Sequence, residues 1–173
     1  MKRSDIQPLP EHFGQYILLE DDSELADVLQ KNLEAVRSLD KNKLTTLGDK
    51  VYAPNKWTVK EVLQHITDTE RIFCYRALVI ARGDINYPPG FDEQLYAKYS
   101  GANERSIDSL LAELIAVKNA TIAMFESFSD TTLQKTGLSS KYEMSVLALG
   151  FAIAGHQTHH LKIIAERYFP LCG

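Results

Sequence analysis

The chain has 173 residues with 45 % hydrophobic and 24 % charged side chains, values typical of a soluble globular protein with a single domain over residues 1–173. Its net charge of −4 counts against a nucleic-acid-binding protein, because such proteins carry a basic surface. The two cysteines, Cys74 and Cys172, are too few and too far apart for a disulfide framework or a thiolate zinc site. They are typical of a protein in a reducing compartment.

No segment predicts export or membrane insertion. The N-terminal residues MKRSDIQPLPEHF start with basic side chains but lack the apolar stretch of a signal peptide. The longest apolar run, around residues 146–154, is too short to cross a bilayer. We therefore expect a cytoplasmic protein with no membrane partner and no nucleic-acid partner.

Four stretches place apolar residues at the three- and four-residue spacing of an amphipathic helix. They cover about residues 23–39, 58–83, 106–128 and 144–168. Few other segments alternate in the manner of strands, and each of the four stretches is longer than an average helix. The pattern therefore predicts an all-α protein built as a four-helix bundle.

Local signals mark the ends of the first two predicted helices. Residues 21–23 (DDS) offer an N-cap and acidic first-turn side chains for the first helix. The second begins with TVKE, which fits a capping box in which the side chains of Thr58 and Glu61 each accept from the other's backbone N–H. Gly83 suits the position just past the end of this helix.

A long connection, DINYPPGFDEQLYAKYSGANE, separates the second and third predicted helices. Its length permits a crossover along the bundle rather than a tight antiparallel turn, and a connection this long often helps to shape a site. We expect it to contain a short helix. Its tyrosines, Tyr87, Tyr96 and Tyr99, could line a pocket, although packing onto the bundle is the commoner role for such residues.

Two histidines lie on the apolar face of the fourth predicted helix. Steps of four, three, four and three residues connect the members of this face, which are Leu149, Ile153, His156, His160 and Ile163. His159 is displaced from His160 by about 100° and should point elsewhere, near the surface. Gln157 is expected to face solvent.

Two imidazoles one helical turn apart can bind one metal ion, as in HExxH helices. Here Gln157 stands where those helices carry the catalytic Glu. The spacing alone is therefore a weak signal for a metal site. Histidines near a helix end more often form hydrogen bonds to carbonyls or water than bind a metal. A third ligand is available in His65, which can face the bundle interior from the second helix. Three histidine ligands would leave a coordination position open, the pattern of a catalytic site.

The sequence around these three histidines also resembles that of a known family, the DinB superfamily of DinB/YfiT-like metalloenzymes. The run Trp57, Thr58, Glu61, His65 and Asp68 matches the family pattern W-[ST]-x-x-E-x-x-x-H-x-x-D, and GHQTHH matches its G-H-x-x-H-H run. The resemblance implies a four-helix bundle with a crossed-over helix order and a divalent metal, zinc or nickel, held by His65, His156 and His160. It also implies a homodimer. Some members of the family conjugate or isomerise substrates with low-molecular-weight thiols such as bacillithiol or mycothiol, and others are labelled hydrolases.

Several further side chains are candidates for catalysis or substrate binding. Glu61 and Asp68 are helical neighbours of His65, so either could orient this ligand or carry a proton, although Glu61 already has a capping role. The arginines Arg71, Arg76 and Arg105 could hold a substrate carboxylate, but each alone is more often a surface ion-pair partner. Trp57 is expected to pack on the end of the bundle.

These observations support two functional hypotheses. The first is a metal-dependent enzyme, either a thiol S-transferase with a small thiol as cosubstrate or a hydrolase, which acts on a small molecule. The second is a non-catalytic bundle in which the metal is structural and a surface binds a partner. An open coordination position beside an accessible cavity favours the enzyme, whereas a sealed site with four protein ligands favours the second hypothesis.

Overall fold

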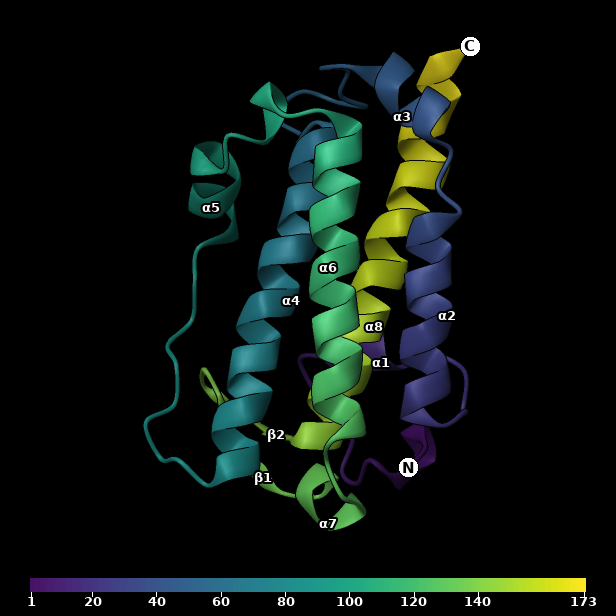
Figure 1. Ribbon diagram of the computed structural model, residues 1–173. Helices are drawn as coiled ribbons and strands as arrows, with labels where there is room; N and C mark the ends of the chain where they lie inside the picture. Colours follow the sequence, from purple (N-terminus) through teal and green to yellow (C-terminus); the bar gives the residue numbers. More distant parts are fainter.

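The computed structural model describes all of residues 1–173 and confirms the predicted four-helix bundle (Figure 1). The long helices are α2 (Leu25–Arg37), α4 (Val59–Arg82), α6 (Ile107–Glu126) and α8 (Val146–Ile163). Shorter helices are α1 (Gly14–Ile17), α3 (Lys41–Leu47), α5 (Glu93–Tyr99) and α7 (Asp130–Leu133). Turns of 3₁₀ helix cover Arg3–Asp5, Ala102–Glu104 and Phe169–Cys172, and a π-helical turn covers Ile164–Tyr168.

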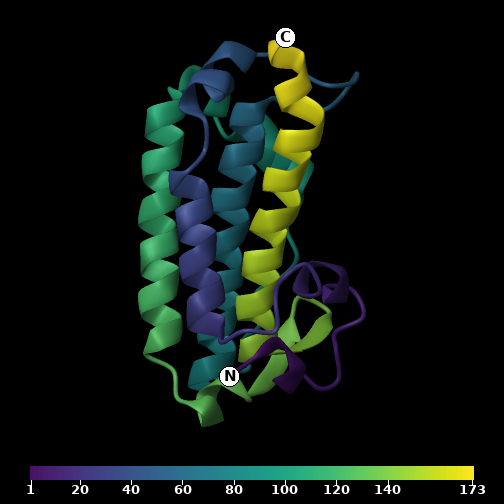
Figure 2. The same ribbon diagram turned by 90° about the vertical axis from the view of Figure 1, so that its right-hand side faces the viewer.

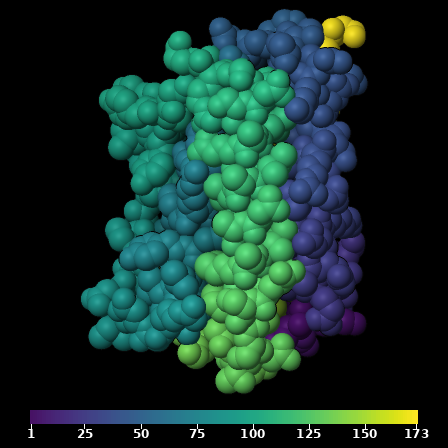
Figure 3. Space-filling model, viewed as in Figure 1, coloured from purple at the N-terminus to yellow at the C-terminus, as the bar shows by residue number.

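The long helices pack as a ring in which α2 and α4 each contact α6 and α8. Helices α4 and α6 follow one another in the chain and run in the same direction, because the connection between them returns along the full length of the bundle (Figure 1). This is the predicted crossover, and it contains the short helix α5. In the space-filling view, the connection lies at the outer edge of the molecule, beside α4 (Figure 3). No helix is both long and apolar enough to cross a membrane.

Capping follows the sequence closely in α4 and less closely in α2. The Thr58 side chain accepts from the backbone N–H of Glu61, the Glu61 carboxylate accepts from that of Thr58, and Gly83 ends α4 with φ of 75°. The residue that precedes α2 is Glu24, whose side chain makes no capping hydrogen bond. The prediction that residues 21–23 cap this helix was wrong, since the helix begins one residue after Glu24, and the Asp21 carboxylate instead accepts from the Lys31 ammonium, 2.6 Å away.

The start of the fourth helix was also predicted wrongly. Strands β1 (Thr136–Ser139) and β2 (Tyr142–Ser145) form an antiparallel hairpin, and α8 begins only at Val146, capped by the Ser145 side chain. Met144 lies on β2, yet it is buried in the same apolar cluster as the first turns of α8. The spacing of Met144 from the apolar residues of α8 therefore fits a helical pattern, although its own backbone is extended. This is why the predicted helix began too early. The hairpin and the N-terminal segment lie beside the lower half of α8 (Figure 2).

The interior consists of two apolar clusters with polar side chains where they meet. We call these polar side chains the polar layer; its buried members are Asn32 on α2, His65, Thr69 and Glu70 on α4, Lys118 and Thr121 on α6, and His156 and Gln157 on α8. The Lys118 ammonium lies 2.7 Å from the Glu70 carboxylate, and the Thr121 hydroxyl donates to that carboxylate at 2.6 Å. Because a buried charge is costly unless it is paired, these contacts allow a polar layer in the core.

Candidate metal centre

Three histidine side chains converge in the polar layer. The Nε2 atom of His156 on α8 lies 3.1 Å from the Nε2 atoms of both His65 on α4 and His160 on α8. The candidate ligand atoms of all three residues lie within 4.8 Å of one another. The α4–α8 contact thus brings together the three residues that the sequence singled out.

The environment keeps these imidazoles neutral. Burial lowers the pKa of His65 to about 4. Burial, helped by His65 and His159, lowers the pKa of His160 to about 3. Burial is also the main reason why the pKa of His156 lies well below its ordinary value, with the neighbouring His160 next. Neutral imidazole is the form that binds metal ions, so near pH 7 no proton has to be displaced from the three rings.

Aromatic and hydroxyl groups hold the rings in place. The Thr69 hydroxyl lies 3.5 Å from Nδ1 of His65, the position where metal-binding histidines find an orienting partner. The Trp57 ring packs on His65 with centroids 4.7 Å apart, and its Nε1 donates to Gln94 on α5 at 3.2 Å. Trp57 therefore contacts the site and fixes the crossover over it, beyond the end-packing role predicted for it. Tyr16 packs edge-to-face against His156 from α1.

The approach of α1 to α8 depends on Gly155. A Cβ atom at this position would lie 1.9 Å from the Tyr16 carbonyl oxygen, well inside van der Waals contact. Only glycine lets the backbone of α1 cross the helix here, one residue before His156. The glycine thus places the Tyr16 ring against the histidine cluster.

Two cavities with different linings reach the cluster. One, of about 220 Å³, is lined by His65 and His156 together with Tyr16, Thr69, Arg76 and the hairpin residue Tyr142, among others. The other, of about 200 Å³, is lined by His160, Trp57 and Tyr168 among others. Glu93 of α5 lines both cavities and is the only carboxylate in either lining. The three histidine side chains therefore border space that a small molecule could occupy.

The comparisons with known proteins agree with this fold. A family model described as the DinB superfamily matches residues 24–164. The chain belongs to the DinB superfamily. Among solved structures, YfiT from Bacillus subtilis has 18 % sequence identity and a TM-score of 0.67, with 93 % of this chain and 88 % of that chain covered. YfiT is described as a probable metal-dependent hydrolase with an unusual four-helix bundle topology, and at this identity the likeness shows the fold. No curated protein matches the chain.

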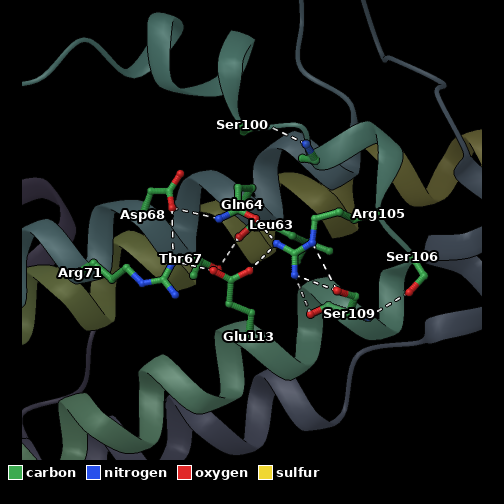
Figure 4. Close-up of polar contacts among 11 residues, drawn as sticks. Leu63, Gln64, Thr67, Asp68, Arg71, Ser100, Arg105, Ser106, Ser109 and Glu113 are labelled. Atoms are coloured by element: carbon green, nitrogen blue, oxygen red, sulfur yellow. Dashed lines mark hydrogen bonds and ion pairs between the residues drawn. The ribbon is translucent and has the colours of Figure 1, made fainter.

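In this DinB-superfamily chain, the contacts of Glu61 and Asp68 lead away from the histidine cluster. The Glu61 carboxylate accepts from the backbone N–H of Thr58 at 2.7 Å and from the Asn103 side chain at 3.2 Å. Asp68 accepts from the Gln64 amide at 2.9 Å and lies 3.5 Å from Arg71 (Figure 4). Neither side chain lines the two cavities beside the histidines.

A polar network between α4 and α6 engages two of the three candidate arginines. Arg71 and Arg105 both pair with the Glu113 carboxylate of α6, and Arg105 also donates to the Gln64 amide oxygen at 2.7 Å (Figure 4). Burial alone would raise the pKa of Glu113, but the hydrogen bonds from the two arginines outweigh burial and lower it. These two arginines are the ion-pair partners that the sequence analysis gave as the commoner alternative.

Other side chains lie elsewhere than predicted. Gln157 is fully buried and donates from Nε2 to the Asn32 carbonyl oxygen of α2 at 2.8 Å, so the prediction that it faces solvent was wrong. The side chains of Tyr96 and Tyr99 are exposed, and neither they nor Tyr87 line a cavity at the histidines. The tyrosine that packs on His156 is Tyr16, which no motif in the sequence marked.

The lowered histidine pKa values predict acid sensitivity of the metal-free DinB-superfamily protein. The pKa of His65 is about 4 in the folded protein and has its ordinary value of 6.5 in the unfolded chain. Between these two pH values the unfolded chain binds more protons than the folded protein, so the protein loses stability as the pH falls through this range. The full shift of 6.5 to about 4 corresponds to roughly 3 kcal/mol of unfolding free energy for this residue. Urea denaturation between pH 7.5 and 4.5 measures the loss.

A His65→Gln variant is the control, because carboxylates titrate in the same range in both proteins. Its unfolding free energy should fall less steeply with decreasing pH than that of the wild type. Parallel pH profiles for the two proteins would contradict the prediction.

Proposed function

We propose that this protein is a metal-dependent enzyme that acts on a small molecule and holds one divalent ion with His65, His156 and His160. The observation that carries the proposal is the convergence of three neutral imidazoles beside two open cavities. Tetrahedral ligands at the usual zinc–nitrogen length of about 2.0–2.1 Å lie roughly 3.3 Å from one another. The two separations that involve Nε2 of His156 are 3.1 Å, close to this value, and the candidate ligand atoms of all three histidines lie within 4.8 Å of one another, so one ion can reach them all after small side-chain shifts.

Hydrolysis is the reaction that we favour. A bound zinc or nickel ion acts as a Lewis acid and lowers the pKa of a water or thiol that it holds. Three protein ligands leave room for such a molecule, and the accessible cavities supply the route to it. The description of YfiT as a probable metal-dependent hydrolase supports the same reaction class for this fold.

The chain offers Glu93 as the proton carrier. It is the only carboxylate that lines the cavities, and it lies near enough to Tyr16 to raise the pKa of that phenol, an effect second to burial. A carboxylate on the solvent-exposed helix α5 can exchange protons with bulk water. Catalytic roles for Glu61 and Asp68 stay predictions, but their hydrogen bonds favour roles in holding the helix ends and the α4–α6 contact.

Thiol transfer is the second candidate, and the presence of two cavities favours it. One cavity reaches His65 and His156, the other reaches His160, and Glu93 lines both. Such an arrangement could hold a small thiol on one side and an electrophile on the other. The thiol cosubstrate and the homodimer stay predictions, and light scattering of the purified protein measures the second.

Metal analysis and a turnover screen test the proposal. Protein purified without an affinity tag should contain close to one equivalent of divalent metal. We expect hydrolysis of activated esters, lactones or amides, or conjugation of an electrophile to bacillithiol, mycothiol or glutathione, that stops on chelation and returns with zinc or nickel. Metal without turnover in any arm would instead favour the non-catalytic metal-binding bundle.

A further inference from the structure

One arginine of the site has no acidic partner. Arg76 lies on α4, lines the larger cavity and is only 3 % exposed. Its only side-chain hydrogen bond runs from Nη2 to the Pro89 carbonyl oxygen at 2.9 Å, and Nε is enclosed without a partner. No carboxylate lies within 4.0 Å of the guanidinium, in contrast to Arg71 and Arg105, which both pair with Glu113.

A buried guanidinium without a counter-charge is expensive. Burial lowers the pKa of Arg76, yet arginine keeps its proton in proteins, so the positive charge stays. The rings of Phe73 and Phe91 lie 5.5 and 6.0 Å from the guanidinium carbon and offset part of the cost through cation–π contacts. Four of the five N–H donors still lack a hydrogen-bond partner in the protein.

We propose that Arg76 binds the carboxylate of a small, apolar or aromatic substrate in the cavity that also reaches His65 and His156. The proposal deepens the proposed function, since it names the class of substrate for the same site. The guanidinium fork matches a carboxylate with two parallel hydrogen bonds. A single cation favours a monoanion over a phosphate dianion, which would need further positive charge.

The rest of the lining suits the apolar body of such a molecule. Phe13, Phe73, Phe91 and Tyr142 contribute aromatic rings to this cavity. The His12 ring stacks on Tyr142 with centroids 4.4 Å apart and extends the aromatic wall. Glu93 is the only acid in the lining, but it is solvent-exposed and makes no ion pair with Arg76. The positive charge is therefore available to a ligand.

Benzoate and its neutral analogue benzamide are suitable probes. Calorimetric titrations should show that metal-loaded and metal-free wild type both bind benzoate more tightly than benzamide. Arg76→Met keeps the aliphatic stem and should weaken benzoate binding roughly 10- to 100-fold, since a charged hydrogen-bonding partner is lost. Its metal content should not change. Arg71→Met, five residues earlier on the same helix, should bind benzoate as the wild type does.

The metal-free arm separates this inference from the proposed function. If the protein fails to bind metal, the proposed function falls, while benzoate selectivity that depends on Arg76 still supports the inference. Equal affinities for benzoate and benzamide in the folded wild type would overturn the inference, as would wild-type benzoate affinity in Arg76→Met. If Arg76→Met does not fold, Arg76→Lys tests the inference instead. Lysine keeps the positive charge, so this variant should retain part of the selectivity for benzoate over benzamide, and complete loss of that selectivity would overturn the inference.

Discussion

Replacing His156 with alanine is expected to abolish stoichiometric metal binding, with a loss of affinity of at least about 100-fold. This exceeds the roughly 10- to 100-fold loss that typically follows removal of an outer-shell partner of a ligand. We expect the larger loss because His156 is the central member of the cluster, with its Nε2 atom 3.1 Å from the Nε2 atoms of both His65 and His160. Competition with a chromophoric chelator for zinc or nickel measures the affinity of wild type and variant.

His159→Ala is the matched control, because His159 belongs to the same GHQTHH run but is not among the converging ligands. Its metal content should equal that of the wild type. A saturating metal should also raise the unfolding free energy of the wild type, by roughly 2.7 kcal/mol at one hundred times the dissociation constant. His156→Ala should lose this gain. Full metal content in His156→Ala would refute the three-histidine site.

The sequence predicted correctly those features that depend on the spacing of residues along a single helix. The capping box at Thr58, the left-handed Gly83 and the shared face of His156 and His160 depend on spacing along one helix, and all three are present in the structure. His65 could be added because its position in α4 lets it face the interior. The length of the connection permitted the crossover, and the short helix expected within it is α5.

The errors arose where tertiary packing decides. Gln157 was placed in solvent because one buried face was assumed for α8, yet every residue from Val146 to Gln157 is buried. Helices α1, α2 and α4 all pack against α8, so it has no polar face over this length. The partner that satisfies the Gln157 amide is a backbone carbonyl of α2, which no spacing along α8 can reveal.

The neighbours of the histidines were missed for the same reason. Tyr16 and Glu93 come from the N-terminal segment and from the crossover, and their positions depend on how these segments dock on the bundle. The three candidate arginines could not be told apart in the sequence. Only the fold shows that Glu113 pairs with Arg71 and Arg105 and leaves Arg76 without an acid.

Gly155→Ala is expected to destabilise the protein by about 1–3 kcal/mol or more, although alanine is the better helix former by roughly 1 kcal/mol. The new Cβ atom would overlap the Tyr16 carbonyl oxygen at 1.9 Å, and a backbone atom cannot rotate away as a side chain can. Helix α1 must therefore move off α8, and the Tyr16 ring must leave His156. Urea denaturation measures the change in unfolding free energy.

Gly150→Ala provides the comparison on the same helix. Its Cβ would meet the Leu25 side chain at 2.7 Å and the Phe125 ring at 2.9 Å, and side chains can shift by rotation at lower cost than backbone. We expect Gly150→Ala to be the milder change of the two. Metal affinity should survive in both variants, because the three ligands stand on α4 and α8 rather than on α1. Equal stability of Gly155→Ala and wild type would mean that α1 does not cross α8 at this glycine in solution.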